Sequence, residues 1–315
     1  IKKKKAFNKE YFNNQILRID NVFKNINFFE KKYNISSRTK WNVEINNQNL
    51  HLCEYSHSTY NSSIFIDNNC LIKKDLKNLF IINGDSHATH YYPMILNSLD
   101  KDSIYIKTYE GCLFSPDIYV IGKNDFKNNK FINFDKCQSY INEQVKLIEK
   151  FSINFENIYL ILSSRYTAYI NQSILMDKNK NVYNKQNIYK EIKKSLINLN
   201  SKIKNINIIL ISPLLEFNYY PFSCFLNNDL CNINIKDDLK RTLEIKKILL
   251  ELSNENKNIY LFDPYKEICK EINICQMYRK DQDLLLFKDT DHLTVEGSTY
   301  LSSDFKIFLK DVLSN

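Results

Sequence analysis

The segment Leu79-Phe-Ile-Ile-Asn-Gly-Asp-Ser-His-Ala88 places an apolar run directly before a glycine turn and a predicted helix start. The apolar run is typical of a buried strand, and Asp85 and Ser86 are residue types that begin helices. A strand that passes through such a turn into a helix exposes the Ser86 hydroxyl at the helix N-terminus. The same three residues, Gly84 to Ser86, also form ordinary turns, so further motifs must support a chemical role.

Around this segment, apolar β-rich runs alternate with helical patterns along the chain. The pattern predicts a parallel sheet with helices on both faces, in which ligands bind beyond the carboxyl ends of the strands. The expected strands are Leu79–Asn83, Ser103–Lys107, Ile158–Leu162, Ile206–Ile211 and Ile259–Phe262. The expected helices are Ala88–Leu99, Ser139–Phe151, Ile188–Leu199, Asp237–Leu252 and Val295–Leu313.

A second motif, Asp289-Thr-Asp-His292, precedes the last amphipathic helix. With Ser86 it supplies a serine, an aspartate and a histidine, the three parts of a hydrolytic triad. We expect His292 to be the general base for Ser86 and Asp289 to orient the imidazole. The alternative is that Asp289 and Asp291 only cap the C-terminal helix, and Asp291 could also remain solvated.

The two motifs together resemble the SGNH hydrolase superfamily, whose first block carries the nucleophile and whose terminal Asp-x-x-His carries both partners. Asp289 to Gly297, the segment Leu160-Ile-Leu-Ser-Ser-Arg-Tyr166 and the cysteines before the terminal motif look like the SGNH domain of acyltransferase-3 type proteins. Those proteins O-acylate, usually O-acetylate, bacterial surface polysaccharides such as lipopolysaccharide. The resemblance implies a three-layer α/β/α sandwich with a central parallel sheet and a flavodoxin-like order.

The expected oxyanion hole combines the backbone N–H of Ser86 with that of Gly111, which matches the glycine block of the superfamily. The usual asparagine after the third strand is missing, because Leu162-Ser-Ser-Arg-Tyr166 stands in its place. We expect Arg165 or Ser164 to substitute as donor or acyl-group contact; the alternative for Arg165 is a purely structural ion pair. Gly122-Lys-Asn-Asp125 matches the Gly-x-Asn-Asp pattern that carries this asparagine in most of the superfamily. It does not follow a third strand, however, so we do not interpret it as that block.

Other polar residues near the motifs are weaker candidates. His87 flanks the nucleophile and, with Ser164, is a candidate substrate contact; His90 is a comparable surface histidine. His51, Cys53 and His57 could form a small metal cluster, but they lack a second paired set of ligands, so we expect no metal.

The chain of 315 residues has 44 basic and 36 acidic residues, a formal charge of +8. The lysines are spread among many asparagines and isoleucines, without the basic stripe of a nucleic-acid-binding protein.

We expect an N-terminal extension or linker over residues 1–74, with a helix around Lys9–Lys32, and a catalytic domain over residues 75–315. The basic run Lys2–Lys5 is a solvated tail or flanks a membrane helix.

Eight cysteines fall mostly in close pairs and lack zinc or redox spacing, which favours disulfides in an oxidising compartment. The expected pairs are Cys53–Cys70, Cys112–Cys137, Cys224–Cys231 and Cys269–Cys275. The sequence shows neither a signal peptide nor a run long enough to span a bilayer. We therefore expect a periplasmic or otherwise extracytoplasmic domain, tethered to the inner membrane by an acyltransferase domain upstream in the same polypeptide.

The expected activity is serine-dependent O-acyl transfer to a polysaccharide through an acyl-Ser86 intermediate. The domain itself needs no cofactor, and the resemblance makes acetyl-CoA the ultimate donor only in the intact membrane protein. A free-standing carbohydrate acetylesterase would use the same triad and is the main alternative. A polysaccharide-binding domain with a vestigial triad is a third, against which the intact Ser86, Asp289 and His292 argue.

Overall fold

The computed structural model describes residues 31–32, 44–45, 48–49, 53–55, 70–72, 77–99, 101–184, 187–203, 205–226, 232–269 and 274–314. The basic run Lys2–Lys5, His51, His57 and nearly all of the expected helix over Lys9–Lys32 lie outside these residues. Among the helices within them, none combines the length and apolar character needed to cross a membrane.

A six-stranded sheet with the order β13-β11-β9-β5-β6-β4 forms the centre of the molecule. Its five long strands are parallel, and only the short edge strand β4 is antiparallel to its neighbour. Numbered along the chain, the parallel strands stand in the order 2-1-3-4-5, which is the flavodoxin-like arrangement. The expected α/β fold is confirmed. The strands are β4 (Leu71–Ile72), β5 (Asn78–Gly84), β6 (Ser103–Ile106), β9 (Asn157–Ser163), β11 (Ile206–Ile211) and β13 (Ile259–Phe262).

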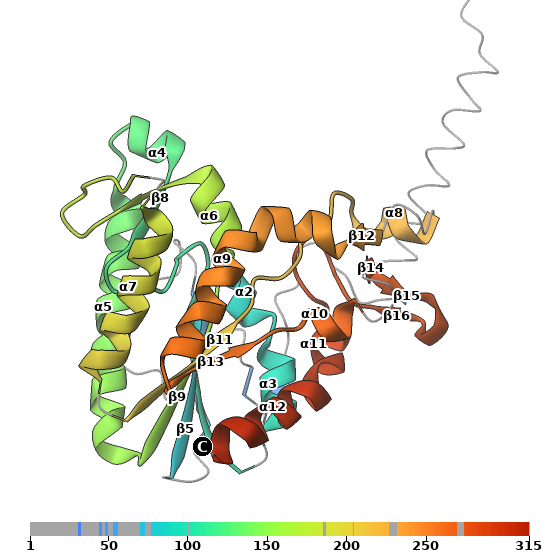
Figure 1. The fold of residues 1–315 in the computed structure, drawn as a ribbon, viewed down its shortest axis with the longest axis horizontal. Helices are drawn as coiled ribbons and strands as arrows, with labels where there is room; N and C mark the ends of the chain where they lie inside the picture. The colour runs from blue at the N-terminus through green and yellow to red at the C-terminus, as the bar shows by residue number, and fades with distance from the viewer. Residues whose placement is uncertain are drawn as a thin grey trace, which may run out of the picture.

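Helices cover both faces of this sheet (Figure 1). On one face Phe151 of α5 packs against Tyr105 of β6, and on the other Phe305 of α12 packs against Phe262 of β13. Burial on both faces explains why the strands read as continuous apolar runs rather than as alternating ones. The first face carries α5 (Ile132–Asn154), α7 (Ile188–Lys202) and α9 (Ile235–Glu255); the second carries α3 (Tyr92–Ser98), α11 (Val295–Tyr300) and α12 (Ser302–Ser314).

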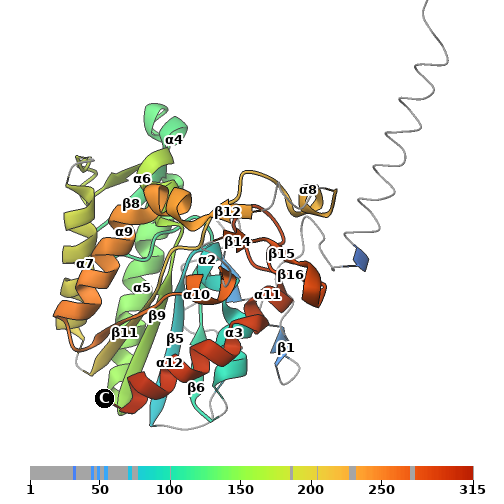
Figure 2. The same ribbon diagram turned by 45° about the vertical axis from the view of Figure 1, so that its right-hand side comes forward.

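Two helices expected from the sequence are each divided in two. The first becomes α2 (Ser86–Thr89) and α3, and the last becomes α11 and α12. Pro93 lies in the first turn of α3, where its missing N–H costs nothing, whereas in the interior of a single helix it would break a hydrogen bond. The short α2 therefore ends soon after Ser86. Figure 2 shows α3, α11 and α12 grouped beside the sheet.

Residues ahead of the expected domain boundary at position 75 pack on the sandwich. Strand β3 (Glu54–Tyr55) pairs with β7 (Thr108–Tyr109), and β4 pairs with β6 at the edge of the main sheet. The Cys53–Cys70 disulfide joins the two segments and is buried. The described parts of residues 53–72 are thus continuous with the domain that was expected to begin at 75.

Shorter elements form small sheets and connections around the core. The Gly122-Lys-Asn-Asp125 stretch spans the end of β8 (Tyr119–Gly122) and the start of α4 (Lys123–Lys127), and β8 belongs to a two-stranded sheet separate from the main one. The short strands are β1 (Glu44–Ile45), β2 (Gln48–Asn49), β8 (Tyr119–Gly122), β10 (Ser173–Met176), β12 (Asn232–Asn234), β14 (Ile274–Gln276), β15 (Tyr278–Arg279) and β16 (Leu284–Leu285). The short helices are α4 (Lys123–Lys127), α6 (Tyr166–Gln172), α8 (Pro221–Leu226) and α10 (Tyr265–Ile268).

Two further expected disulfides are present in addition to Cys53–Cys70. Cys112 is bonded to Cys137, and Cys269 is bonded to Cys275 shortly before the terminal motif. The fourth expected pair, Cys224–Cys231, includes a residue outside the described ones.

Candidate active site

The nucleophile candidate follows β5 at the carboxyl end of the sheet. Gly84, the last residue of β5, has a φ of +138°, a conformation that L side chains rarely adopt. A Cβ at this position would overlap the carbonyl oxygen of Ser163 at the end of β9. Glycine therefore allows the turn and also the close approach of two neighbouring strand ends, which delivers Ser86 to the centre of the carboxyl edge.

Asp85 fixes this turn with a buried carboxylate. Its Oδ1 accepts the His87 N–H at 2.8 Å and so caps α2, while Oδ2 accepts the Arg165 N–H at 3.0 Å and the Tyr169 hydroxyl. The carboxylate is 1% exposed, and each of its oxygens has a donor. Asp85 thus links the nucleophile turn to the loop after β9. The sequence indicates the cap but not the link across the sheet.

Ser86, His292 and Asp289 form a continuous chain of hydrogen bonds. His292 Nε2 lies 3.0 Å from Ser86 Oγ, and Nδ1 lies 3.0 and 2.9 Å from the two Asp289 oxygens. With a proton on Nδ1 held by the carboxylate, Nε2 presents a lone pair that can accept the serine proton. This is the geometry that a nucleophile, a base and an orienting acid require.

The loop before α11 holds the base in position. Asp289 Oδ1 also accepts the backbone N–H groups of Asp291 and His292, at 3.0 and 2.8 Å. Thr294 caps α11 by accepting the Gly297 N–H at 2.8 Å and donates to the Leu285 carbonyl. Asp289 therefore orders its own loop as well as the imidazole, and the alternative that it serves only as a helix cap does not describe its contacts.

The electrostatics of the site favour a basic imidazole. Burial works to lower the pKa of His292, but the hydrogen bond and charge of Asp289, with the charge of Asp291, raise it above the ordinary value. Burial works to raise the pKa of Asp289, yet its bond to His292 and the charge of the imidazole keep it below the usual range. Asp289 is therefore ionised whenever His292 acts as a base.

We expect ester hydrolysis to fall on acidification with an apparent pKa above 6.5, the ordinary value for histidine. Only neutral His292 can accept the serine proton, and its raised pKa moves the loss of activity to higher pH. In Asp291→Asn one of the charges that raise this pKa is absent, so the acid limb should move to lower pH. A kcat–pH profile measures the shift, and an unchanged acid limb in a folded Asp291→Asn variant would contradict it.

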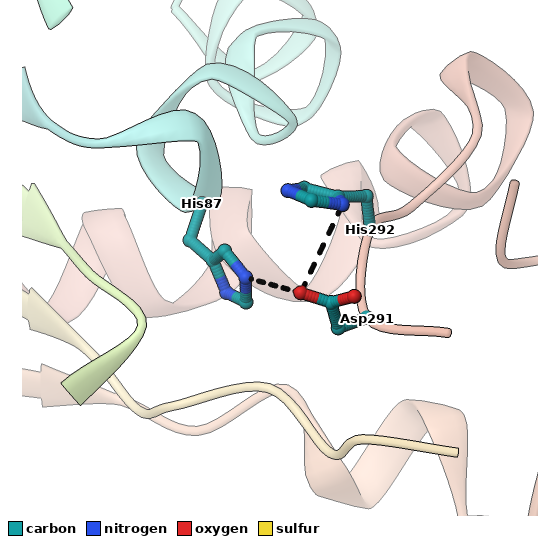
Figure 3. A group of neighbouring side chains, drawn as sticks. All are labelled: His87, Asp291 and His292. Atoms are coloured by element: carbon teal, nitrogen blue, oxygen red, sulfur yellow. Dashed lines mark hydrogen bonds and ion pairs between the residues drawn. The ribbon is translucent and has the colours of Figure 1, made fainter. Parts of the chain in front are cut away.

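Asp291 and His87 depart from the sequence-based expectations. Asp291 is 5% exposed rather than solvated, and its Oδ2 accepts a hydrogen bond from His87 Nε2 at 3.0 Å (Figure 3). His87 is 1% exposed and is therefore not a surface residue, while its role as a substrate contact stays a prediction. His90 is also buried, and burial together with the nearby His87 and His292 holds its pKa well below the ordinary value. Sequence proximity to Ser86 could not show that α2 turns these imidazoles inward.

Dashed lines join Asp291 Oδ2 to both imidazoles in Figure 3, and this oxygen lies 3.9 Å from His292 Nδ1. Burial works to raise the pKa of Asp291, but the hydrogen bond from His87 and the charges of His292, His87 and Arg165 hold it well below the usual range. The carboxylate is a second negative charge beside the base, in addition to Asp289.

Arg165, expected as an oxyanion donor, points its guanidinium at carboxylates. Nε and Nη2 donate to the two oxygens of Glu216 at 3.0 and 2.9 Å, and Nε also lies 3.1 Å from Asp291 Oδ2. Glu216 further accepts from the Thr167 hydroxyl. The geometry favours the structural ion pair, the alternative that the sequence left open, with Glu216 as the partner that sequence reasoning missed.

Arg165→Ala should lower the free energy of unfolding by about 2 kcal/mol, because Glu216 loses two charged hydrogen bonds and buried Asp291 loses an ion-pair partner. Arg165→Lys should recover only part of this, since an ammonium cannot form the two-pronged contact with Glu216. Urea denaturation gives the stability. Turnover should fall by less than the roughly hundredfold loss that follows removal of an oxyanion donor. A larger fall in kcat with unchanged stability would restore the oxyanion role.

The remaining expected oxyanion donor, Gly111, lies in an exposed turn after β7. Its φ of +74° is in the left-handed region that favours glycine. Thr89 of α2 and Thr108 of β7 are joined through their hydroxyls at 2.9 Å, which holds this turn against the nucleophile helix. Ser164 is 3% exposed, and its carbonyl accepts the Tyr166 N–H at 2.9 Å. Neither contact involves a substrate, and the role of Ser164 as a substrate contact stays a prediction.

Within the described residues, His87, Asp291 and His292 are the set whose ligand atoms are close enough to hold a metal ion, all within 4.8 Å. The same Asp291 oxygen contacts the Arg165 guanidinium, and His292 Nδ1 is held by Asp289. A cation bound here would compete with the Arg165 guanidinium for Asp291. It would also break the hydrogen bond from His292 Nδ1 to Asp289, which orients the imidazole. These contacts fit a hydrogen-bonded cluster better than a metal centre.

A three-layer sandwich with a serine after its first parallel strand and an Asp-x-x-His before its last helix defines the SGNH class of hydrolases. Over residues 53–306 the sequence matches the family described as SGNH domains fused to AT3 domains, and the chain belongs to this family.

Solved structures similar to the chain come from several bacteria. The periplasmic domain of a lipopolysaccharide acetyltransferase from Salmonella ser. Paratyphi A is 21% identical, with a TM-score of 0.52 over 82% of this chain and 91% of that one. A carbohydrate acetylesterase from Sinorhizobium meliloti is 10% identical, with a TM-score of 0.40 over 75% and 99%. The C-terminal catalytic domain of a peptidoglycan O-acetyltransferase from Streptococcus pneumoniae is 11% identical, with a TM-score of 0.34 over 77% and 97%. No curated protein sequence is significantly similar to the chain.

Proposed function

We propose that this domain transfers an acyl group, in the simplest case acetyl, to a hydroxyl of a bacterial surface polysaccharide through an acyl-Ser86 intermediate. The observation that carries the proposal is the hydrogen-bonded chain from Ser86 Oγ through His292 to Asp289. An activated serine hydroxyl at the carboxyl edge of the sheet is suited to attack an ester carbonyl.

In the first step Ser86 Oγ bonds to the acyl carbon while His292 Nε2 takes its proton. The negative charge passes to the carbonyl oxygen, toward which the N–H groups of Ser86 and Gly111 are proposed to donate. When the tetrahedral intermediate collapses, the bond to the leaving group breaks and His292 returns the proton to it. A sugar hydroxyl then gives its proton to His292 and attacks the acyl-serine. When this second tetrahedral intermediate collapses, the bond from the acyl carbon to Ser86 Oγ breaks and His292 returns the proton to Oγ.

The membrane context is part of the proposal. Domains of this family are fused to AT3 domains, which supports a membrane acyltransferase as the partner domain. Three disulfides among the described residues support an oxidising, extracytoplasmic compartment. We place acetyl-CoA, as the ultimate donor, on the membrane domain rather than on this chain. The domain from Salmonella, a lipopolysaccharide acetyltransferase periplasmic domain, is in keeping with this arrangement.

The test is a competition between water and sugar for the acyl group. The purified domain is given p-nitrophenyl acetate and increasing amounts of an O-deacetylated surface polysaccharide, and mass spectrometry measures acetyl esters on the glycan. Glycan acetylation that rises with acceptor and is absent in Ser86→Ala supports transfer. Release of acetate alone at every acceptor concentration would identify an esterase instead.

A further inference from the structure

A polar groove of about 770 Å³ lies at the end of the sheet opposite Ser86. It is bounded by the first residues of several parallel strands and by the C-terminal residues of α12. Figure 1 shows the C-terminus at this end, beside the start of β5. Because β5 runs from Asn78 at the groove to Gly84 near the nucleophile, the two regions are about 20 Å apart. The groove is therefore separate from the candidate active site.

The strand register places an array of amides on one face of the sheet. Asn78 pairs with Asn157, and Tyr159 pairs with Asn207 on the next strand. These three asparagines are half-buried, and Asn258, just before β13, is exposed. The array is organised in part by its own bonds, since Asn157 Nδ2 donates to Asn78 Oδ1 at 3.2 Å and Asn78 Nδ2 donates to Asp102 at 3.1 Å. Side-chain amides supply both donors and acceptors, the chemistry that hydroxyl groups need.

Two tyrosines, two lysines and the end of α12 complete the lining, and the second lysine, Lys77, stands just before β5. Tyr159 is buried and stacks on Phe80 with ring centroids 4.7 Å apart, which uses that ring within the core. Tyr260 on the edge strand β13 is only half-buried and offers an apolar ring surface with a polar hydroxyl. Lys257, exposed at the entrance to β13, adds a positive charge beside Asn258.

We propose that this groove is a secondary binding site for an acidic glycan chain, with hydroxyls on the asparagine amides, a sugar ring on Tyr260 and a carboxylate near Lys257. Ligand sites combine a concave surface with a few placed polar groups, and this groove has the volume and the donor set for several sugar units. The identification of this glycan with the acyl acceptor rests on the proposed function. A polymer held in the groove can then present successive sugar units to Ser86.

The test uses an octamer of galacturonic acid as the probe and maltooctaose as its neutral counterpart, with isothermal titration calorimetry on the whole chain. We expect the acidic octamer to bind more tightly than the neutral one. Lys257→Glu should weaken its binding about fivefold or more, because an attractive charge becomes a repulsive one. Lys150→Glu, the same change on exposed α5 across the sheet, should leave binding unchanged.

A second pair of variants tests the ring. Tyr260→Ala should weaken binding, whereas Tyr260→Phe, which keeps the ring, should retain most of it. Hydrolysis of p-nitrophenyl acetate should stay at the wild-type rate in all the groove variants. Equal binding of the two octamers, no binding of the acidic one, or wild-type binding by Lys257→Glu would overturn the proposal. None of these binding results would affect the turnover that depends on Ser86. Conversely, turnover that survives Ser86→Ala would overturn the proposed function but not the binding of an acidic glycan in the groove.

Discussion

Ser86→Ala should lower the turnover of p-nitrophenyl acetate by at least about a thousandfold, because the variant keeps the site but lacks the atom that forms the acyl intermediate. Ser86 Oγ forms a hydrogen bond with His292 Nε2 at 3.0 Å. The side chain that caps α2 belongs to Asp85 and not to Ser86. Removing the hydroxyl should therefore leave the melting temperature close to that of the wild type. Steady-state kinetics and a thermal melt on the same preparation measure the two effects.

Matched variants define what a loss of activity means. Ser303→Ala removes a hydroxyl from an exposed position on α12 and should change neither rate nor stability. His292→Ala should match Ser86→Ala, while Asp289→Asn should leave a small residual rate, because orientation of the base is lost rather than the base itself. Activity that persists in Ser86→Ala would exclude the serine nucleophile.

Gly84→Ala should lower the free energy of unfolding by about 3 kcal/mol or more. The new Cβ would overlap the Ser163 carbonyl oxygen and crowd the Ala88 side chain, and the φ of +138° adds backbone strain. Relief requires β5 and β9 to move apart at the carboxyl edge, where Asp85 joins the two strand ends. Urea denaturation measures the loss, and a decrease in soluble protein would have the same origin.

Gly122→Ala is the matched control for this change. Gly122 has a φ of −62°, and the nearest atom to an added Cβ is an Asp125 carboxylate oxygen at 3.6 Å, an ordinary contact. The variant should be as stable as the wild type. Equal stability of Gly84→Ala and Gly122→Ala would contradict the close approach of β5 to β9.

Local patterns were sufficient for the architecture. The apolar runs at Leu79–Asn83 and Ile206–Ile211 are strands because residues buried on both faces of a parallel sheet have no polar alternation, and their limits agree with β5 and β11 to within a residue. The helix break at Pro93 was missed, although proline in a first helical turn is a recognisable sequence signal.

The sandwich and the two motifs that hold Ser86, Asp289 and His292 follow from the sequence alone, because both depend on short-range spacing and residue type. The roles of the residues beside those motifs follow only from the folded arrangement. Asp291 contacts His87 and Arg165, and Arg165 contacts Glu216, across 204, 126 and 51 positions of sequence. Contacts between separate loops depend on how strand ends meet at one edge of the sheet, and a buried carboxylate selects its donors only when that edge has been assembled.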